Sequence, residues 1–143
     1  MEGGWWKRYR PDQFTYHDID LDKGDGVDFT ALPEPDNAYD AVCFDPPYVA
    51  SGGISKTHGG FQASYGIGSI LNNASAGELD RMINVGISEA ARVARQWLLV
   101  KCMEFAGGGS VFVDMPFKVT QWALDVGLTK HDQIVHQIGR AHV

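Results

Sequence analysis

One short segment places a strong constraint on the fold. Tyr39-Asp40-Ala41-Val42-Cys43-Phe44 is an apolar, β-prone run, which predicts a buried strand. The next residues are Asp45-Pro46-Pro47-Tyr48. Two consecutive prolines fix the backbone and remove two amide donors, so the strand must end there. The carboxylate of Asp45 is therefore expected at the carboxyl end of a strand, where open α/β sheets bind their ligands.

The rest of the chain alternates between strand-like and helix-like segments. We expect strands at residues 14–20, 39–44 and 97–102 and from residue 133, and helices from Ser75 to Arg95 and from Pro116 to Gly127. Ser75 and Glu78 form a capping-box pattern at the start of the first helix. This order predicts one α/β domain, without internal repeats, built on a mostly parallel sheet.

The two expected helices each have an apolar face. In the first, apolar and small residues recur at helical spacing: Leu79, Met82, Ile83, Gly86, Ile87, Ala90, Ala91 and Val93. In the second, the expected apolar face is made of Trp122, Ala123 and Val126.

Composition is ordinary for a globular protein, with 44% hydrophobic and 21% charged residues among 143. We expect a cytoplasmic protein, because no apolar run is long enough to span a bilayer. Cys43 and Cys102 fall in expected buried strands and are interpreted as core residues in a reducing compartment. No cysteine and histidine spacing indicates a metal site.

The net charge of −6 counts against nucleic-acid binding, because stand-alone binders are usually basic. Basic residues gather near the start of the chain beside aromatic ones, at Trp5, Trp6, Lys7, Arg8, Tyr9 and Arg10. Such interleaving can hold a nucleic acid. An exposed helix start anchored by a tryptophan explains the same cluster, and this interpretation is preferred.

An acid, a rigid carbonyl and an aromatic plane suit the recognition of a planar base through its exocyclic amino group. Asp45 and the Pro46 carbonyl accept hydrogens, and Tyr48 offers a stacking face. The alternative is a strand that ends in a proline turn capped by Asp45.

The Asp-Pro-Pro-Tyr motif resembles the signature of the amino-methyltransferases that act on adenine or cytosine in DNA. The resemblance implies S-adenosylmethionine as cofactor, a Rossmann-like sheet, and a catalytic set of Asp45, Pro46, Pro47 and Tyr48. It implies methyl transfer to a base amino group, with adenine favoured over cytosine. An RNA base methyltransferase of related fold and a non-catalytic domain that keeps the fold are the alternatives.

The cofactor residues follow from the same resemblance and from the general rule that the second strand of such sheets ends in an acid that binds ribose. Asp18 and Asp20 both fit the ribose position, and Asp18 fits better. Asp28 and Phe29 stand where the family holds the adenine of the cofactor, and Gly3 and Gly4 where a glycine-rich turn ends. The alternatives are strand-end or turn acids and a core phenylalanine.

Residues 49–74 form a long segment rich in Gly, Ser and Asn, and loops of this length in compact domains are usually functional or mobile. It is interpreted as the loop that contacts the target nucleic acid, through Lys56, His58, Phe61 and Tyr65. A disordered surface loop is the alternative. Lys101, at the end of another expected strand, is left out of the site because strand-end lysines are usually solvated.

Both ends of the sequence suggest a fragment. Residues 138–143 match the translation of a common sequencing-adapter oligonucleotide and are expected to be non-native. Residues 1–137 are then a partial methyltransferase domain that lacks its first strand and its last strands. The oligomeric state is not predicted.

Overall fold

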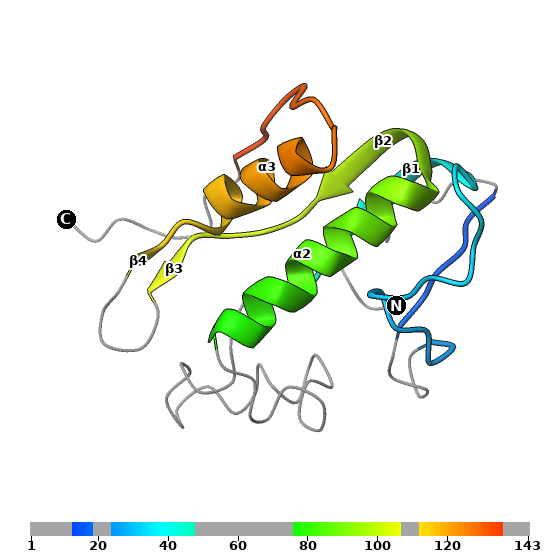
Figure 1. Ribbon diagram of the computed structural model, residues 1–143, viewed down its shortest axis with the longest axis horizontal. Coiled ribbons are helices and arrows are strands. Elements are labelled where there is room, and N and C mark those ends of the chain that lie inside the picture. The colour runs from blue at the N-terminus through cyan, green and yellow to red at the C-terminus, as the bar shows by residue number, and fades with distance from the viewer. Residues whose placement is uncertain (1–12, 19–23, 48–75, 107–111, 136–143) are drawn as a thin grey trace.

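The computed structural model describes residues 13–18, 24–47, 76–106 and 112–135. The elements in chain order are β1 (Tyr39–Phe44), α2 (Ala76–Val93), β2 (Ala94–Val100), β3 (Phe105–Ala106), β4 (Phe112–Val113) and α3 (Met115–Asp125) (Figure 1). The expected α/β class is confirmed at this level, as a small domain with a parallel pair of strands and two helices.

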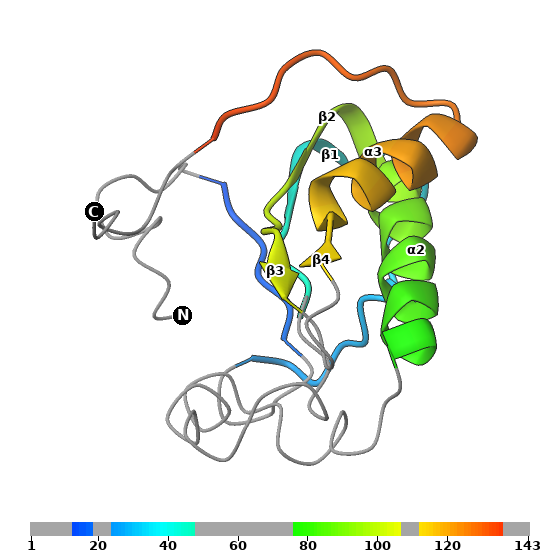
Figure 2. The same cartoon turned by 90° about the vertical axis from the view of Figure 1, so that its left-hand side faces the viewer.

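Strands β1 and β2 are parallel neighbours, and α2 is the crossover between them. Their register pairs Ala41 with Trp97 and Phe44 with Val100. Both strands therefore end at the same edge. Figure 2 shows α2 and α3 on one side of this pair and residues 13–18 on the other. Helices that connect parallel strands pack on the sheet in this way.

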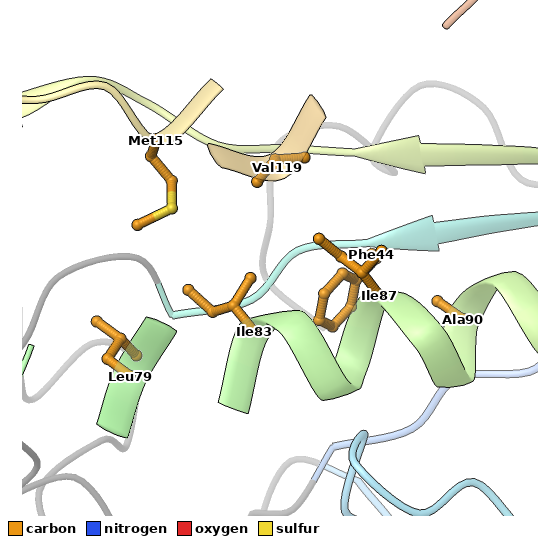
Figure 3. Packing of buried hydrophobic residues seen from close by; sticks show 7 residues of the cluster. All are labelled: Phe44, Leu79, Ile83, Ile87, Ala90, Met115 and Val119. Atoms are coloured by element: carbon orange, nitrogen blue, oxygen red, sulfur yellow. The ribbon is translucent and has the colours of Figure 1, made fainter. Parts of the chain in front are cut away.

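The helix-covered face of the sheet carries the core. Phe44 is buried, and Val42, Leu98 and Val100 are partly buried against the same cluster. From α2, Ile83 and Ile87 are fully buried and meet Met115 and Val119 of α3, as the close view in Figure 3 illustrates. The helical spacing thus predicts the core face of α2 correctly, because one apolar stripe must face the sheet.

The opposite face of the sheet is exposed at every second position. Ala41, Cys43, Trp97 and Leu99 occupy it, and the edge of the Trp97 ring meets His131 with ring centroids 5.2 Å apart. The prediction that both cysteines are buried in strands is wrong. Cys43 is exposed on this face, and Cys102 is half-buried beyond the end of β2. Side chains alternate along a strand, so a sheet covered on one face buries only half of them.

Helix α3 is bounded by local signals. The Asp114 carboxylate caps it by accepting from Phe117 N at 2.9 Å, and Pro116 lies in the first turn. Gly127 ends it with a φ of 86°, which glycine adopts without strain. The expected apolar face is only partly right, because Met115 and Val119 are buried whereas Val126 is exposed.

Several expected boundaries and strands are wrong. The expected helix end at Arg95 lies inside β2, because the chain leaves α2 at Val93 to pair with β1, and Arg95 there bonds Asp40 and the Asn37 carbonyl. Residues 14–18 and 133–135 are irregular instead of extended in a sheet. Residues 14–18 are tied to the segment that follows them by the side-chain contacts of His17. In the other segment, Ile134 and Val135 are largely exposed. The short antiparallel pair of β3 and β4 was not expected.

Neither α2 nor α3, the helices within the described ranges, is long and apolar enough to cross a membrane.

Candidate functional site

The carboxyl edge of the parallel pair holds the first candidate group. Phe44 is buried at 8% exposure, and its ring packs on Phe29 with centroids 5.3 Å apart. The next residue, Asp45, has a side chain that is 52% exposed, and Pro46 beside it is buried. Asp45 is thus an accessible carboxylate on a backbone fixed by a core residue before it and a buried proline after it.

Lys101 lies beside Asp45. Its ammonium donates to Asp45 Oδ2 at 2.7 Å, and its backbone N–H donates to the Phe44 carbonyl at 2.9 Å. The pair forms because each residue directly follows one of two parallel strands whose last residues are opposite each other. We call Asp45, Pro46, Pro47 and Lys101 the strand-end site.

A second group of side chains, centred on Arg92 in the last turn of α2, holds residues 24–37 against this helix. The Arg92 guanidinium donates to Leu32 O at 3.0 Å, Glu34 O at 2.7 Å and Asp36 Oδ1 at 3.0 Å. It also makes a two-pronged contact with Glu89, at 2.9 and 2.8 Å. The hydrogen bonds to the carboxylates, first to Glu89 and then to Asp36, raise the pKa of the guanidinium. The planar fork of arginine suits such a cluster of acceptors.

His17 joins residues 13–18 to the same segment. Its Nδ1 lies 2.6 Å from Asp25 Oδ2, and its Nε2 lies 2.7 Å from Glu34 Oε1. Burial alone would lower the pKa of His17, but the two carboxylates outweigh it and the net shift is upward. An imidazolium that donates at both nitrogens explains this geometry. Glu34 also accepts from the Tyr39 hydroxyl at 3.1 Å.

The acids that the resemblance assigns to the cofactor are found on these two joined segments. Asp18 accepts from the Tyr16 hydroxyl at 2.7 Å, and its carbonyl accepts from Gly26 N at 2.8 Å. Asp28 Oδ1 accepts from both the N–H and the hydroxyl of Thr30, each at 2.8 Å. Asp28 therefore stabilises its own turn, with the second oxygen able to accept from a ligand.

The contact between the two segments is close at one glycine. A Cβ on Gly24 would lie 2.6 Å from Asp18 Cβ and 2.8 Å from Asp18 N. Only glycine fits there, so the position of Asp18 depends on it. Phe29 is partly buried against the core cluster, as in the alternative of a core phenylalanine.

Other predicted site residues lie outside the described ranges: Gly3, Gly4, Asp20, Tyr48, Lys56, His58, Phe61 and Tyr65. The same holds for the basic and aromatic cluster at residues 5–10. In the part of the chain that the structure describes, no three His, Cys, Asp or Glu side chains are grouped as metal ligands.

Sequence reasoning missed Lys101, His17, Glu34 and Arg92. Lys101 had a usable signal, since it follows the second parallel strand as Asp45 follows the first. The other three had none, because their contacts join separate segments. The contacts of His17 reach 8 and 17 residues along the chain, and those of Arg92 with residues 32–36 reach 56 to 60.

The His17 contacts predict a pH dependence of stability. Because the folded pKa is raised above the usual 6.5, the contribution is fully present below that pH and is lost as pH rises through the folded pKa. The free energy of unfolding, measured by urea titration at several pH values, should therefore fall as the pH rises above 6.5 and through the raised pKa of His17. His17→Asn should remove this slope, and His131→Asn, which alters only an exposed ring contact, should keep it. An unchanged slope in His17→Asn would contradict the assignment.

At acidic pH, the change in stability depends on Asp25 and Glu34, the two partners of His17. The His17 hydrogen bond lowers the pKa of Asp25, and that of Glu34 is also lowered because hydrogen bonds outweigh its burial. These contributions are present above the usual carboxyl pKa and are lost as pH falls through the folded values. Stability should be highest between the two limbs.

Comparison of the chain with protein-family models, with curated proteins and with solved structures finds no significant match.

Proposed function

We propose that this chain is part of an enzyme that transfers a methyl group from S-adenosylmethionine to the exocyclic amino group of a base in DNA, with adenine favoured over cytosine. One observation carries the proposal. Asp45 is an accessible carboxylate at the carboxyl end of a parallel strand, fixed between buried Phe44 and buried Pro46. Ligands of open α/β sheets bind at this edge.

The residues of the strand-end site suit the chemistry of a base amino group. Its lone pair is delocalised into the ring, which makes the nitrogen a poor nucleophile. Asp45 and the Pro46 carbonyl accept its two hydrogens, which localises the lone pair and directs it. After transfer the nitrogen releases one proton to water. Tyr48, by the resemblance, stacks on a base that has left the duplex.

Two of the residues assigned to the cofactor, Asp18 and Asp28, carry groups whose chemistry suits it. S-adenosylmethionine supplies a methyl group on a positively charged sulfur. Asp18 suits a ribose diol, since a carboxylate accepts two hydrogen bonds, and Asp28 suits an adenine amino group. The two segments that carry these acids are held together by His17 and by the close contact at Gly24. This joined pair supports the proposal.

The direct test begins by sequencing the source DNA across both ends of this sequence. The protein encoded by the reading frame found there is then expressed. The protein is incubated with methyl-labelled S-adenosylmethionine and with DNA or RNA in competition. Digested nucleosides are then separated by chromatography. We expect label in N6-methyladenine from DNA. Label in RNA identifies the related RNA enzyme instead, and no label in either contradicts methyl transfer.

A non-catalytic interaction domain is the second candidate. The observation that favours it is the net charge of −6, which is unusual for a protein that grips nucleic acid. Calorimetry with S-adenosylmethionine separates the candidates, because only the enzyme requires measurable cofactor binding.

A further inference from the structure

The parallel strands carry one ion pair at each end. Asp40 and Arg95 pair at the amino end, and Asp45 and Lys101 pair at the carboxyl end. All four side chains are partly or largely exposed to solvent, so both pairs are screened and contribute little to stability. Both pairs therefore join an aspartate to a cation near solvent, and they differ in location, because only the second lies in the strand-end site.

Two contacts with described residues hold Lys101 in that site. Its N–H bonds the carbonyl of the last β1 residue, Phe44, and its ammonium bonds Asp45 Oδ2. The backbone hydrogen bond fixes the main chain of Lys101, and the ammonium contact fixes one oxygen of the Asp45 carboxylate. A carboxylate has about four lone-pair positions, so Oδ1 can still accept a further hydrogen.

We propose that Lys101 is a positioning residue for the base amino group, an inference that rests on the proposed function. The last torsion of an aspartate side chain is broad, so an unpaired carboxylate samples many orientations. The contact between Lys101 Nζ and Asp45 Oδ2 selects one of them. Oδ1 then meets the amino hydrogen in a fixed direction, and small errors of position cost large factors in rate.

The experiment compares Lys101→Met, Lys101→Gln, Lys101→Arg and Arg95→Met in the protein from the complete reading frame. Two quantities are measured: the single-turnover rate of methyl transfer, and the ratio of affinities for a short oligodeoxyadenylate and for its analogue with purine in place of adenine. The ratio of affinities is measured without cofactor and reports recognition of the amino group alone.

Lys101→Met and Lys101→Gln should lower the rate by roughly 10–100-fold. Both should also reduce the preference for adenine over purine. Lys101→Arg should keep most of the rate and most of the preference for adenine, since arginine retains a donor and a positive charge. Arg95→Met should leave both at the wild-type value, because its ion pair lies at the other end of the strands.

The outcomes separate the two proposals. If the wild type transfers methyl groups and the Lys101 variants behave like Arg95→Met, the role of Lys101 is overturned and the proposed function stands. If the wild type neither transfers methyl groups nor prefers adenine, the proposed function fails and Lys101 loses its role with it. Lys101→Gln keeps most of the side-chain length, so its result stands even where Lys101→Met does not fold.

Discussion

Asp45→Ala should lower methyl transfer by roughly 10²–10³-fold, the usual loss when one preorganised polar group at a reacting centre is removed. The substitution deletes the acceptor for a base amino hydrogen and leaves Lys101 without its carboxylate. The buried neighbours Phe44 and Pro46 are unchanged, so the strand end should keep its backbone. Single-turnover kinetics give the rate, and calorimetry should show cofactor affinity close to the wild-type value.

Asp40→Ala is the matched control. Asp40 lies on β1, the strand that Asp45 directly follows, and it is exposed. It pairs with Arg95 of β2, much as Asp45 pairs with Lys101 just beyond β2. It differs in lying at the amino end of β1. Its loss should change the rate little. Equal rates in the two variants would show that Asp45 has only a structural role and would remove the basis of the proposed mechanism.

The sequence predicts those parts of the fold that depend on neighbouring residues. The spacing of Leu79, Ile83 and Ile87 predicts the buried face of α2, and the two prolines after Asp45 predict where β1 ends. Gly127 predicts the end of α3 through its positive φ. Each of these signals lies within a few residues of the feature that it determines.

The incorrect predictions concern pairing between distant residues. Apolar residues at 14–18 and 133–135 have strand propensity, but a strand exists only where a partner supplies hydrogen bonds. The His17 contacts with Asp25 and Glu34 hold the first segment by side chains instead. In the same way, burial of Cys43 depends on whether the second face of the sheet is covered, which its own neighbours do not determine.

The same distinction between local signals and distant pairing applies to the candidate site. Asp45 was placed correctly at a strand end because its position follows from the adjacent run and prolines. The ion pair with Lys101 requires the parallel register of two strands whose members lie 56 residues apart. The contacts of Arg92 span similar distances in the chain. The motif therefore predicts where the Asp45 carboxylate lies, and only the topology shows that Lys101 is its partner.

Gly86→Ala should destabilise the protein by about 1–3 kcal/mol, the usual cost of overpacking a core. Alanine in place of glycine normally stabilises a helix by roughly 0.5–1 kcal/mol. Here, however, a Cβ on Gly86 would lie 2.6 Å from ring atoms of both Phe29 and Phe44. Gly86 is buried, and the two rings pack on each other, so neither can move without disturbing the other. Urea unfolding measures the effect.

Gly77→Ala in the same helix is the control, because its added Cβ would meet nothing within 4 Å apart from its chain neighbours and the backbone of its own helix. It should be neutral or stabilise by up to about 1 kcal/mol. Opposite signs in the two variants would show that the Phe29 and Phe44 rings, and not helix propensity, determine the residue at 86. Because Phe44 precedes Asp45, the displaced ring should also shift the carboxylate, so Gly86→Ala should slow methyl transfer where Gly77→Ala does not. A Gly86→Ala protein as stable and as active as Gly77→Ala would mean that the core does not fix the strand end, and Asp45 would then need another source of positioning.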